Sequence, residues 1–188
     1  MFDFLLAATV NQRVMALLAK FSDREFYERQ VARTIGIAYG SANHALNELY
    51  STGAVKRRQE GKMSFYSINP SNAGIREYKK LINVMLVEPL TKSLKSISIK
   101  VVLYGSCAQG TDTSASDLDL FIVSSAKERV SEAIGDFSFP GGFEDIHIQA
   151  VIKNPVELLE AGEKDHEFLE EVERGIVLWE RTADESGV

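Results

Sequence analysis

Apolar residues in the first third of the chain recur at helical spacing, which predicts three short helices. The first helix is expected over Gln12–Phe21. Ser22-Asp23 is a typical N-cap, so a second helix should begin there and end at Gly36. A third helix is predicted over Gly40–Tyr50.

The pattern then changes to one that is typical of strands. Two β-prone runs within Val55–Ile68 flank Glu60-Gly61-Lys62, which predicts a β-hairpin. Asn69–Asn72 is rich in residues that break regular structure and is the best candidate for a domain boundary. A long helix is expected over Ala73–Leu94, either kinked or divided at Pro89.

Strands and helices alternate in the second half of the chain. Strands are predicted at Ile97–Tyr104, Leu118–Val123, Asp145–Ile152 and Ile176–Trp179, and helices at Lys127–Phe137, Pro155–Ala161 and Glu167–Arg174. This order predicts an α+β fold: a mixed β-sheet with flanking helices, preceded by a small N-terminal domain of helices and a hairpin. The predicted parts are a domain at 1–70, a connecting helix at 71–96 and a second domain at 97–188.

Composition adds few constraints. The 188 residues are 45% hydrophobic and 26% charged, as in ordinary soluble proteins. No apolar run is long enough for a membrane helix, and the apolar start that contains Asp3 is expected to open a packed helix rather than act as a signal peptide. The single Cys107 excludes an internal disulfide. We therefore expect a cytoplasmic protein that has no membrane partner.

Charge is distributed unevenly along the chain. Residues 1–70 carry nine Lys/Arg and six Asp/Glu, whereas residues 71–188 carry twelve and twenty-one. A basic first domain beside an acidic second one suggests that the first domain meets a polyanion.

The order of helix, turn, helix and basic hairpin is typical of one kind of DNA-binding domain. Phe26–Ile37, Ala42–Leu49 and the hairpin that follows resemble a winged helix-turn-helix of the prokaryotic and archaeal regulators. The resemblance implies that the third helix lies in the major groove and that the hairpin contacts phosphates. The residues it points to are Ser41, Asn43, His44 and Asn47 on the helix, and Lys56, Arg57, Lys62 and Arg58 on the hairpin. The alternative is a dimerisation or protein–protein device with a solvated hairpin.

A glycine-serine loop followed by spaced carboxylates is the second candidate site. Gly105 permits close backbone approach at the end of a strand, and Ser106 adds a hydroxyl donor, so the two suit a triphosphate. Asp117 and Asp119 are two residues apart at the start of a strand and should emerge on one face. Paired carboxylates opposite phosphates suit Mg²⁺ or Mn²⁺.

This segment resembles the signature of the DNA polymerase β-like nucleotidyltransferase superfamily, and most of all its minimal members from bacteria and archaea. The resemblance implies transfer of a nucleoside monophosphate from a nucleoside triphosphate to a protein or small-molecule acceptor. Gly105 and Ser106 would serve the phosphates, and Asp117 and Asp119 would bind the metal and be catalytic. Because similar minimal proteins pair with a small toxin, an antitoxin-like role is an alternative.

One expected residue is missing from this pattern. The superfamily places a third carboxylate on the next core strand, where Gln149 stands in this chain. Asp145 lies on the same face by alternation and is a candidate substitute as the third catalytic residue if the register of the strand differs. Without a third carboxylate, the chain could instead be a catalytically degenerate, nucleotide-binding transcriptional regulator. Two-fold symmetric DNA sites favour a homodimer in either case.

Overall fold

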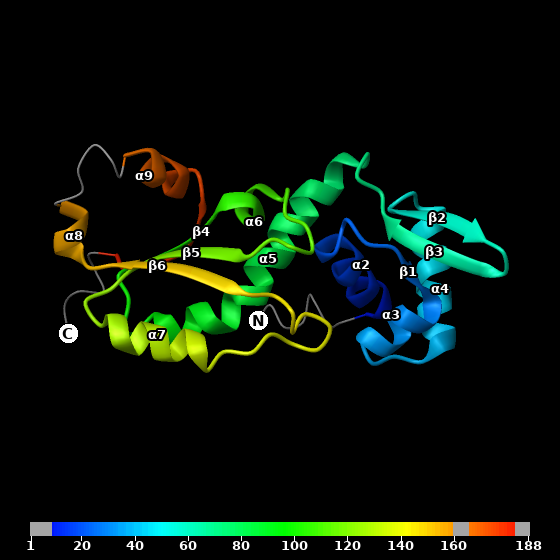
Figure 1. Cartoon of the computed structure of the whole chain (residues 1–188), viewed down its shortest axis with the longest axis horizontal. Coiled ribbons are helices and arrows are strands. Elements are labelled where there is room, and N and C mark those ends of the chain that lie inside the picture. The colour runs from blue at the N-terminus through cyan, green and yellow to red at the C-terminus, as the bar shows by residue number, and fades with distance from the viewer. Residues whose placement is uncertain (1–8, 160–165, 183–188) are drawn as a thin grey trace.

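The computed structural model describes residues 9–159 and 166–182. The described chain is elongated, with the first helices and a small sheet at one end and a larger sheet at the other (Figure 1). The long helix α5 (Ala73–Leu94) crosses the middle of the molecule between them.

The N-terminal region, from α2 to β3, is built around three helices. Helix α2 (Val10–Lys20) begins with a capping box, in which Thr9 and Gln12 satisfy each other's backbone N–H groups. Helix α4 (Tyr39–Ser51) packs against both α2 and α3 (Glu28–Thr34). These helices bury the apolar faces that the sequence pattern predicted.

A three-stranded antiparallel sheet completes this region. Strands β2 (Val55–Glu60) and β3 (Met63–Ile68) form the predicted hairpin, and the short strand β1 (Phe26–Tyr27) pairs with β3. The predicted N-cap at Ser22-Asp23 is wrong, because β1 lies between these residues and α3. Their side chains bond instead to the loop at residues 112–114.

Helix α5 is capped by Asn72, whose side chain accepts a hydrogen bond from the Gly74 N–H. Its bounds agree with the prediction, but Pro89 does not divide it. Contacts with α2, α6, α7 and β7 make α5 the element that joins the two ends of the fold.

The larger sheet is mixed and has the strand order β6-β5-β4-β7. Strand β4 (Lys100–Tyr104) pairs antiparallel with β5 (Leu118–Val123) and β7 (Ile176–Glu180), while β6 (Ile148–Lys153) runs parallel to β5. Two strands begin later than predicted, β4 at Lys100 and β6 at Ile148. Asp145 therefore lies in the turn before β6 and not within the strand.

Helices cover both faces of this sheet. One face packs on α5 and on α7 (Lys127–Gly135), whereas the other carries a smaller apolar cluster with α8 (Pro155–Leu159) and α9 (His166–Glu173). Helix α6 (Gly105–Gln109) forms the start of the predicted glycine-serine loop. The predicted helix at 155–161 ends outside the described residues.

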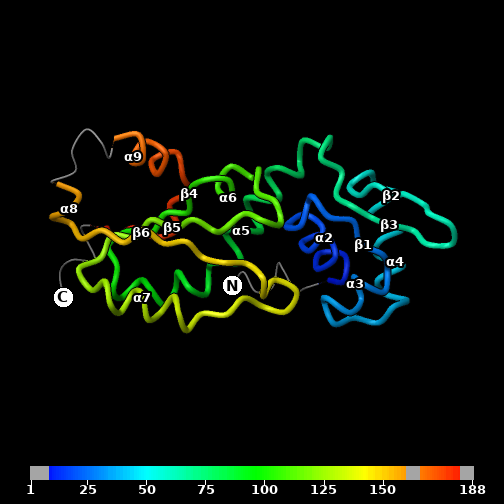
Figure 2. Tube along the Cα trace, in the orientation of Figure 1, coloured from blue at the N-terminus to red at the C-terminus, as the bar shows by residue number. Residues whose placement is uncertain are grey.

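The chain path also brings the second half back to the first (Figure 2). Between α7 and β6 the chain reaches the N-terminal region, where Phe143 stacks on Phe21 at 6.2 Å between ring centroids. Within 9–159 and 166–182, no helix combines the length and apolar character that a membrane crossing requires.

Candidate functional site

The two predicted metal-binding carboxylates lie at the start of β5. Leu118, Leu120 and Ile122 alternate with them and are fully buried against α5 and α7. Asp119 therefore emerges on the opposite face, together with Phe121 from the α9 cluster. Asp117 is exposed and Asp119 half-buried, so solvent reaches both carboxylates.

Gly105 lies directly beside Asp119. Tyr104 pairs with Asp119 across the antiparallel ladder, so the following residue turns over the carboxylate. A Cβ atom built on Gly105 would be only 2.7 Å from Asp119 Oδ2, and the Gly105 φ angle of +66° lies in the left-handed region. Only glycine meets both conditions without strain. The structure thus brings the predicted phosphate turn and the predicted metal ligand together.

Within residues 9–159 and 166–182, no positive charge balances these carboxylates: neither Asp117 nor Asp119 forms an ion pair or a side-chain hydrogen bond there. Burial raises the pKa of Asp119, and the charges of Asp117 and Glu171 raise it further. A site that disfavours its own negative charge in this way is suited to a cation.

A further carboxylate, that of Glu171, lies close enough to act on the charge of Asp119. Its side chain is exposed, but helix α9 holds it over the site: Phe168, one turn earlier, packs edge-on against Tyr104 and Phe121 at 5.6 and 5.8 Å. Burial raises the pKa of Tyr104, and Asp119 and Glu171 both add to the rise. The spacing of Phe168 and Glu171 on a helix could have indicated this, but the docking of α9 could not be predicted.

The third predicted carboxylate position is occupied by an amide. Gln149, the residue that the sequence placed at this position, pairs with Asp119 across the parallel β5–β6 ladder. Asp145 lies four residues earlier, outside the strand, and is not among the charges that shift the pKa of Asp119.

The donor set fits a divalent cation that takes part of its shell from a nucleotide. In the part of the chain that the structure describes, no three His, Cys, Asp or Glu residues are grouped closely enough to hold a metal alone. Mg²⁺ usually takes one or two carboxylates and completes its shell with phosphates and water. Asp117 and Asp119 would supply those carboxylates.

A second acidic residue on the same loop has the opposite environment. Asp112 is fully buried, its Oδ2 accepts from Lys20 Nζ at 3.0 Å and its Oδ1 accepts from Asn83 Nδ2 at 3.1 Å. Lys79 Nζ is 3.5 Å from Asp112 Oδ1 and also donates to the Asp112 carbonyl. We call Lys20, Lys79, Asn83 and Asp112 the Asp112 cluster. Local sequence patterns do not reveal this cluster, because its members come from three separate segments.

Cys107 connects this cluster with the site. Its thiol donates to the Asp117 carbonyl at 3.3 Å, and its own carbonyl accepts from Asn83 at 3.0 Å. Burial raises the pKa of Cys107 to about 11, against the opposing charge of Lys20. The thiol is therefore a neutral packing group, as its position in a tight loop suggested.

The predicted DNA-binding residues lie at the far end of the molecule. On α4, Ser41, His44 and Asn47 are exposed, and Asn47 donates to Asn43. His44 faces Glu48 at 3.5 Å. Helix α4 thus presents a polar face that carries few cations.

The hairpin cations differ in their surroundings. Lys56 and Lys62 are exposed. Arg57 donates to Ser64 and lies over the Tyr66 ring. Arg58 forms ion pairs with Glu25 and Glu60, both at 2.7 Å, and their hydrogen bonds raise its pKa. Arg58 therefore has less free charge to offer a phosphate than the two lysines have.

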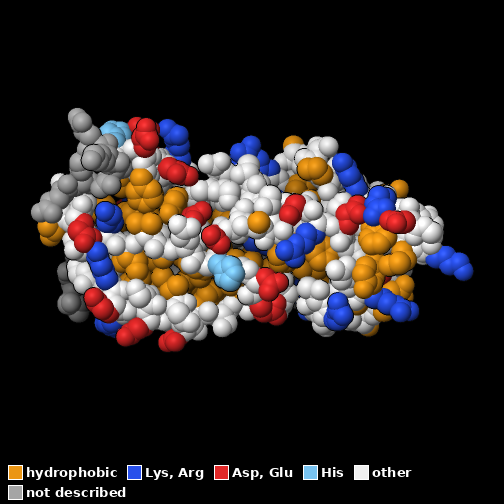
Figure 3. All heavy atoms as spheres, viewed as in Figure 1, with side chains coloured by type: hydrophobic (Ala, Val, Ile, Leu, Met, Phe, Trp, Pro, Cys, Tyr) orange, Lys and Arg blue, Asp and Glu red, His pale blue; other side chains and the backbone are white. Residues whose placement is uncertain are grey.

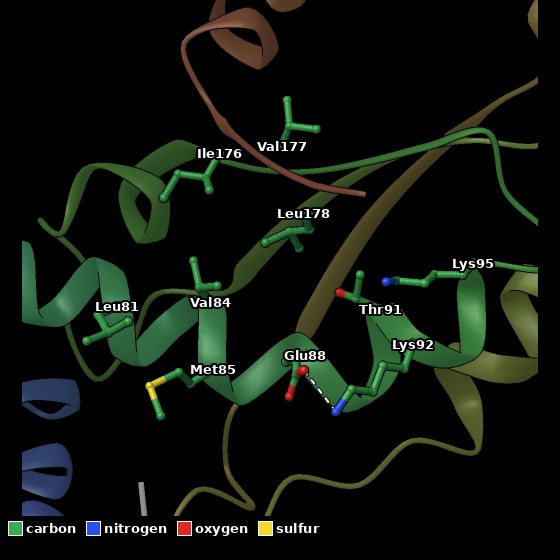
Figure 4. Close-up of a pocket in the computed structure, with 10 residues that line it drawn as sticks. All are labelled: Leu81, Val84, Met85, Glu88, Thr91, Lys92, Lys95, Ile176, Val177 and Leu178. Atoms are coloured by element: carbon green, nitrogen blue, oxygen red, sulfur yellow. Dashed lines mark ion pairs between the residues drawn. The ribbon is translucent and has the colours of Figure 1, made fainter. Parts of the chain in front are cut away.

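A pocket of about 280 Å³ lies elsewhere, between α5 and the edge strand β7 (Figure 4). Leu81 and Val177 are exposed at its rim, and Glu88 pairs with Lys92 at 2.8 Å. It is on the α5 side of the sheet, opposite Asp119.

In the space-filling view, acidic side chains lie near the middle of the molecule, between the N-terminal region and the larger sheet (Figure 3).

Comparison with known proteins gives one family. The family model described as "Polymerase beta, Nucleotidyltransferase" matches residues 87–184, which is more than half of the chain.

Solved structures give weaker likenesses. A protein from Sulfolobus solfataricus that is provisionally assigned as a nucleotidyltransferase is 17% identical, with 60% of this chain and 94% of that one covered and a TM-score of 0.37. The transcriptional regulator BldR from the same organism is 18% identical (51% and 70% covered, TM-score 0.39), and NolR from Sinorhizobium fredii is 17% identical (41% and 72%, TM-score 0.32). With TM-scores this low, these likenesses carry no argument.

Proposed function

Since the chain belongs to the polymerase β nucleotidyltransferase family, we propose that it transfers a nucleoside monophosphate from a nucleoside triphosphate to an acceptor, with Mg²⁺ or Mn²⁺. The observation that carries this proposal is the Asp119 carboxylate, which lies against Gly105 and has no cationic partner among the described residues.

In this reaction an acceptor hydroxyl attacks the α-phosphorus and pyrophosphate leaves. Gly105 would let the phosphates approach the backbone, and the Ser106 hydroxyl would donate to a phosphate oxygen. Asp117 and Asp119 would hold the divalent ion, which would neutralise negative charge on the transferred phosphate. The acceptor is a protein or a small molecule. A homodimer and a toxin partner stay predictions.

A second candidate follows from Gln149. Because this neutral amide stands beside Asp119 in the ladder, strand β6 offers no third carboxylate to take the proton from an attacking hydroxyl. The same site could then bind a nucleotide without turnover and act in a transcriptional regulator. Asp145 is a weaker substitute base, since it precedes the strand.

Incubation with α-³²P-labelled nucleoside triphosphates and Mg²⁺ separates the two candidates. The matched control is Asp117→Asn/Asp119→Asn, which keeps side-chain shape and removes both charges. Transfer that the control loses supports the enzyme, whereas binding without transfer supports the regulator. Transfer that survives in the control would contradict the role given to both carboxylates.

We propose that the N-terminal region is a winged helix-turn-helix that binds DNA. Support comes from its element order, three helices followed by a hairpin, with β1 added to the sheet. Ser41, Asn43, His44 and Asn47 on α4 would face the major groove, while Lys56, Arg57 and Lys62 would contact phosphates.

The environments of the cations predict an order of effects. Lys62→Ala should weaken binding to a fluorescent 30-base-pair duplex more than Arg58→Ala, because Arg58 is already paired with Glu25 and Glu60. Loss of one phosphate contact should also reduce the salt slope by about 1. Fluorescence anisotropy at several salt concentrations measures both quantities. Equal or reversed effects would contradict this assignment of the phosphate contacts.

A further inference from the structure

The loop at residues 111–116 is held both by α5 and by the N-terminal region. Lys20 from α2 binds the Asp112 carboxylate, and Ser22 Oγ donates to the Asp112 carbonyl at 3.3 Å. Asp23 then accepts from both the N–H and the hydroxyl of Ser114, each at 2.7 Å. Lys20 at the end of α2 and two residues just after it, Ser22 and Asp23, therefore hold the segment that joins the phosphate turn to the carboxylates.

The free-energy cost of burying charged side chains indicates that these contacts between the loop and the N-terminal region are specific. Lys20 and Asp112 have side chains that are 1% and 0% exposed, and Lys79 is 6% exposed. Buried charges are tolerated only when they are paired and hydrogen-bonded in good geometry. Such a cluster has few alternative arrangements, so it fixes the position of the loop relative to α2 and α5.

Both parts of the site are attached to this cluster. Asn83 holds the carbonyl of Cys107, the residue after Ser106, while the Cys107 thiol holds the carbonyl of Asp117. Within the loop, Ser116 Oγ accepts from the Thr113 N–H at 2.9 Å, which closes a turn just before Asp117. A shift of the N-terminal region would therefore move the carboxylates relative to the phosphate turn.

We propose that Asp112 is a positioning residue for the nucleotide site, and that the N-terminal region sets the geometry of Asp117 and Asp119 through Lys20, Ser22 and Asp23. The inference rests on the proposed nucleotide binding but not on DNA binding. One consequence is linkage: any ligand that shifts the N-terminal region changes nucleotide affinity, and nucleotide changes the affinity of that ligand by the same factor.

The exposed contact between Asp23 and Ser114 offers a test that leaves the buried cluster intact. The variants are Asp23→Ala, Ser114→Ala and the double variant. Glu132→Ala, which removes an exposed carboxylate from α7, is the matched control. Binding of trinitrophenyl-labelled ATP and GTP with Mn²⁺ is measured by fluorescence, well below each variant's thermal midpoint, so that a change in affinity is separate from a change in stability.

We expect Asp23→Ala to raise the nucleotide Kd about three- to tenfold, in the range reported for coupling residues. Ser114→Ala should also raise the nucleotide Kd. The double variant should bind nucleotide no more weakly than Asp23→Ala, because both residues form one contact. Glu132→Ala should bind like the wild type.

Two results would overturn the inference, and they differ. If the wild type binds and Asp23→Ala binds equally well, the N-terminal region does not set the site, while the proposed function stands. If the wild type binds neither nucleotide with Mn²⁺, the proposed function fails and this inference fails with it. Additive losses in the double variant would show that the two side chains act separately, against the shared contact on which the inference depends.

Discussion

Asp112 and Asp119 lie on one short stretch of chain but have opposite surroundings. Asp112 is fully buried, and it accepts hydrogen bonds from Lys20 and Asn83. Asp119 is half-buried, faces Asp117 and Glu171, and has no cationic partner in the described residues. The first carboxylate has its charge satisfied by the fold, whereas the second has not.

This difference separates a structural carboxylate from a candidate functional one. A protein gains stability when a buried charge is fully paired, but it gains none from grouping like charges that lack a partner. Unbalanced charge of the second kind is retained where a ligand will complete it. The contrast therefore assigns stability and the positioning of the loop to Asp112, and direct ligand binding to Asp119, and each assignment can be tested by substitution.

The largest effect should come from Asp112→Asn. Loss of this charge leaves Lys20 and Lys79 buried without an anion, which should lower the free energy of unfolding by about 3–5 kcal/mol. Urea denaturation at neutral pH measures it. A loss below about 1 kcal/mol would show that water or relaxation compensates the lysines, and the contrast with Asp119 would then be lost.

A smaller effect is expected at the phosphate turn. Gly105→Ala and Gly61→Ala both place a side chain at a left-handed φ, +66° and +59°, so each should cost about 1–2 kcal/mol of stability. Only at Gly105 would the new Cβ press on Asp119, since nothing lies within 4 Å at Gly61. Gly105→Ala should therefore also weaken nucleotide binding about tenfold or more, and Gly61→Ala should not. Equal binding by both variants would contradict the close approach at Asp119.

The smallest effect concerns the pH dependence of stability. Because burial, Asp117 and Glu171 raise the pKa of Asp119 in the folded state, its ionisation should cost stability as pH rises from the unfolded value through the folded pKa. Asp119→Asn removes that cost. The variant should thus gain stability relative to the wild type as the pH rises from about 3 to about 7, measured by thermal unfolding. A relative loss over this interval would mean that Asp119 has a partner.

Much of the fold could be predicted from local patterns. Helix α4, the hairpin, α5 and β5 lie close to their predicted positions, because their apolar spacing and turn residues are strong signals within a few residues. The position of Gln149 beside Asp119 could also be predicted, because a shift of one residue in the register of β6 would place a different residue there. The wrong strand start at Asp145 came from extending the alternation of apolar residues into a turn.

Contacts between distant segments could not be predicted. Nothing local to Lys20 indicates that a lysine in the last turn of an amphipathic helix is buried, because its partner Asp112 is 92 residues away. Ser22 and Asp23 look like a helix cap for the same reason: their actual partners lie in the loop at residues 112–114. The approach of Glu171 to the site depends on how α9 docks, which apolar spacing alone does not fix.

The most direct test of the account is to measure stability and Mn²⁺-dependent nucleotide binding together for Asp119→Asn. The variant should lose nucleotide affinity while its thermal midpoint at neutral pH is kept or raised, because the charge serves a ligand at some cost to the fold. A variant that binds nucleotide like the wild type, or one that loses stability instead of affinity, would contradict it.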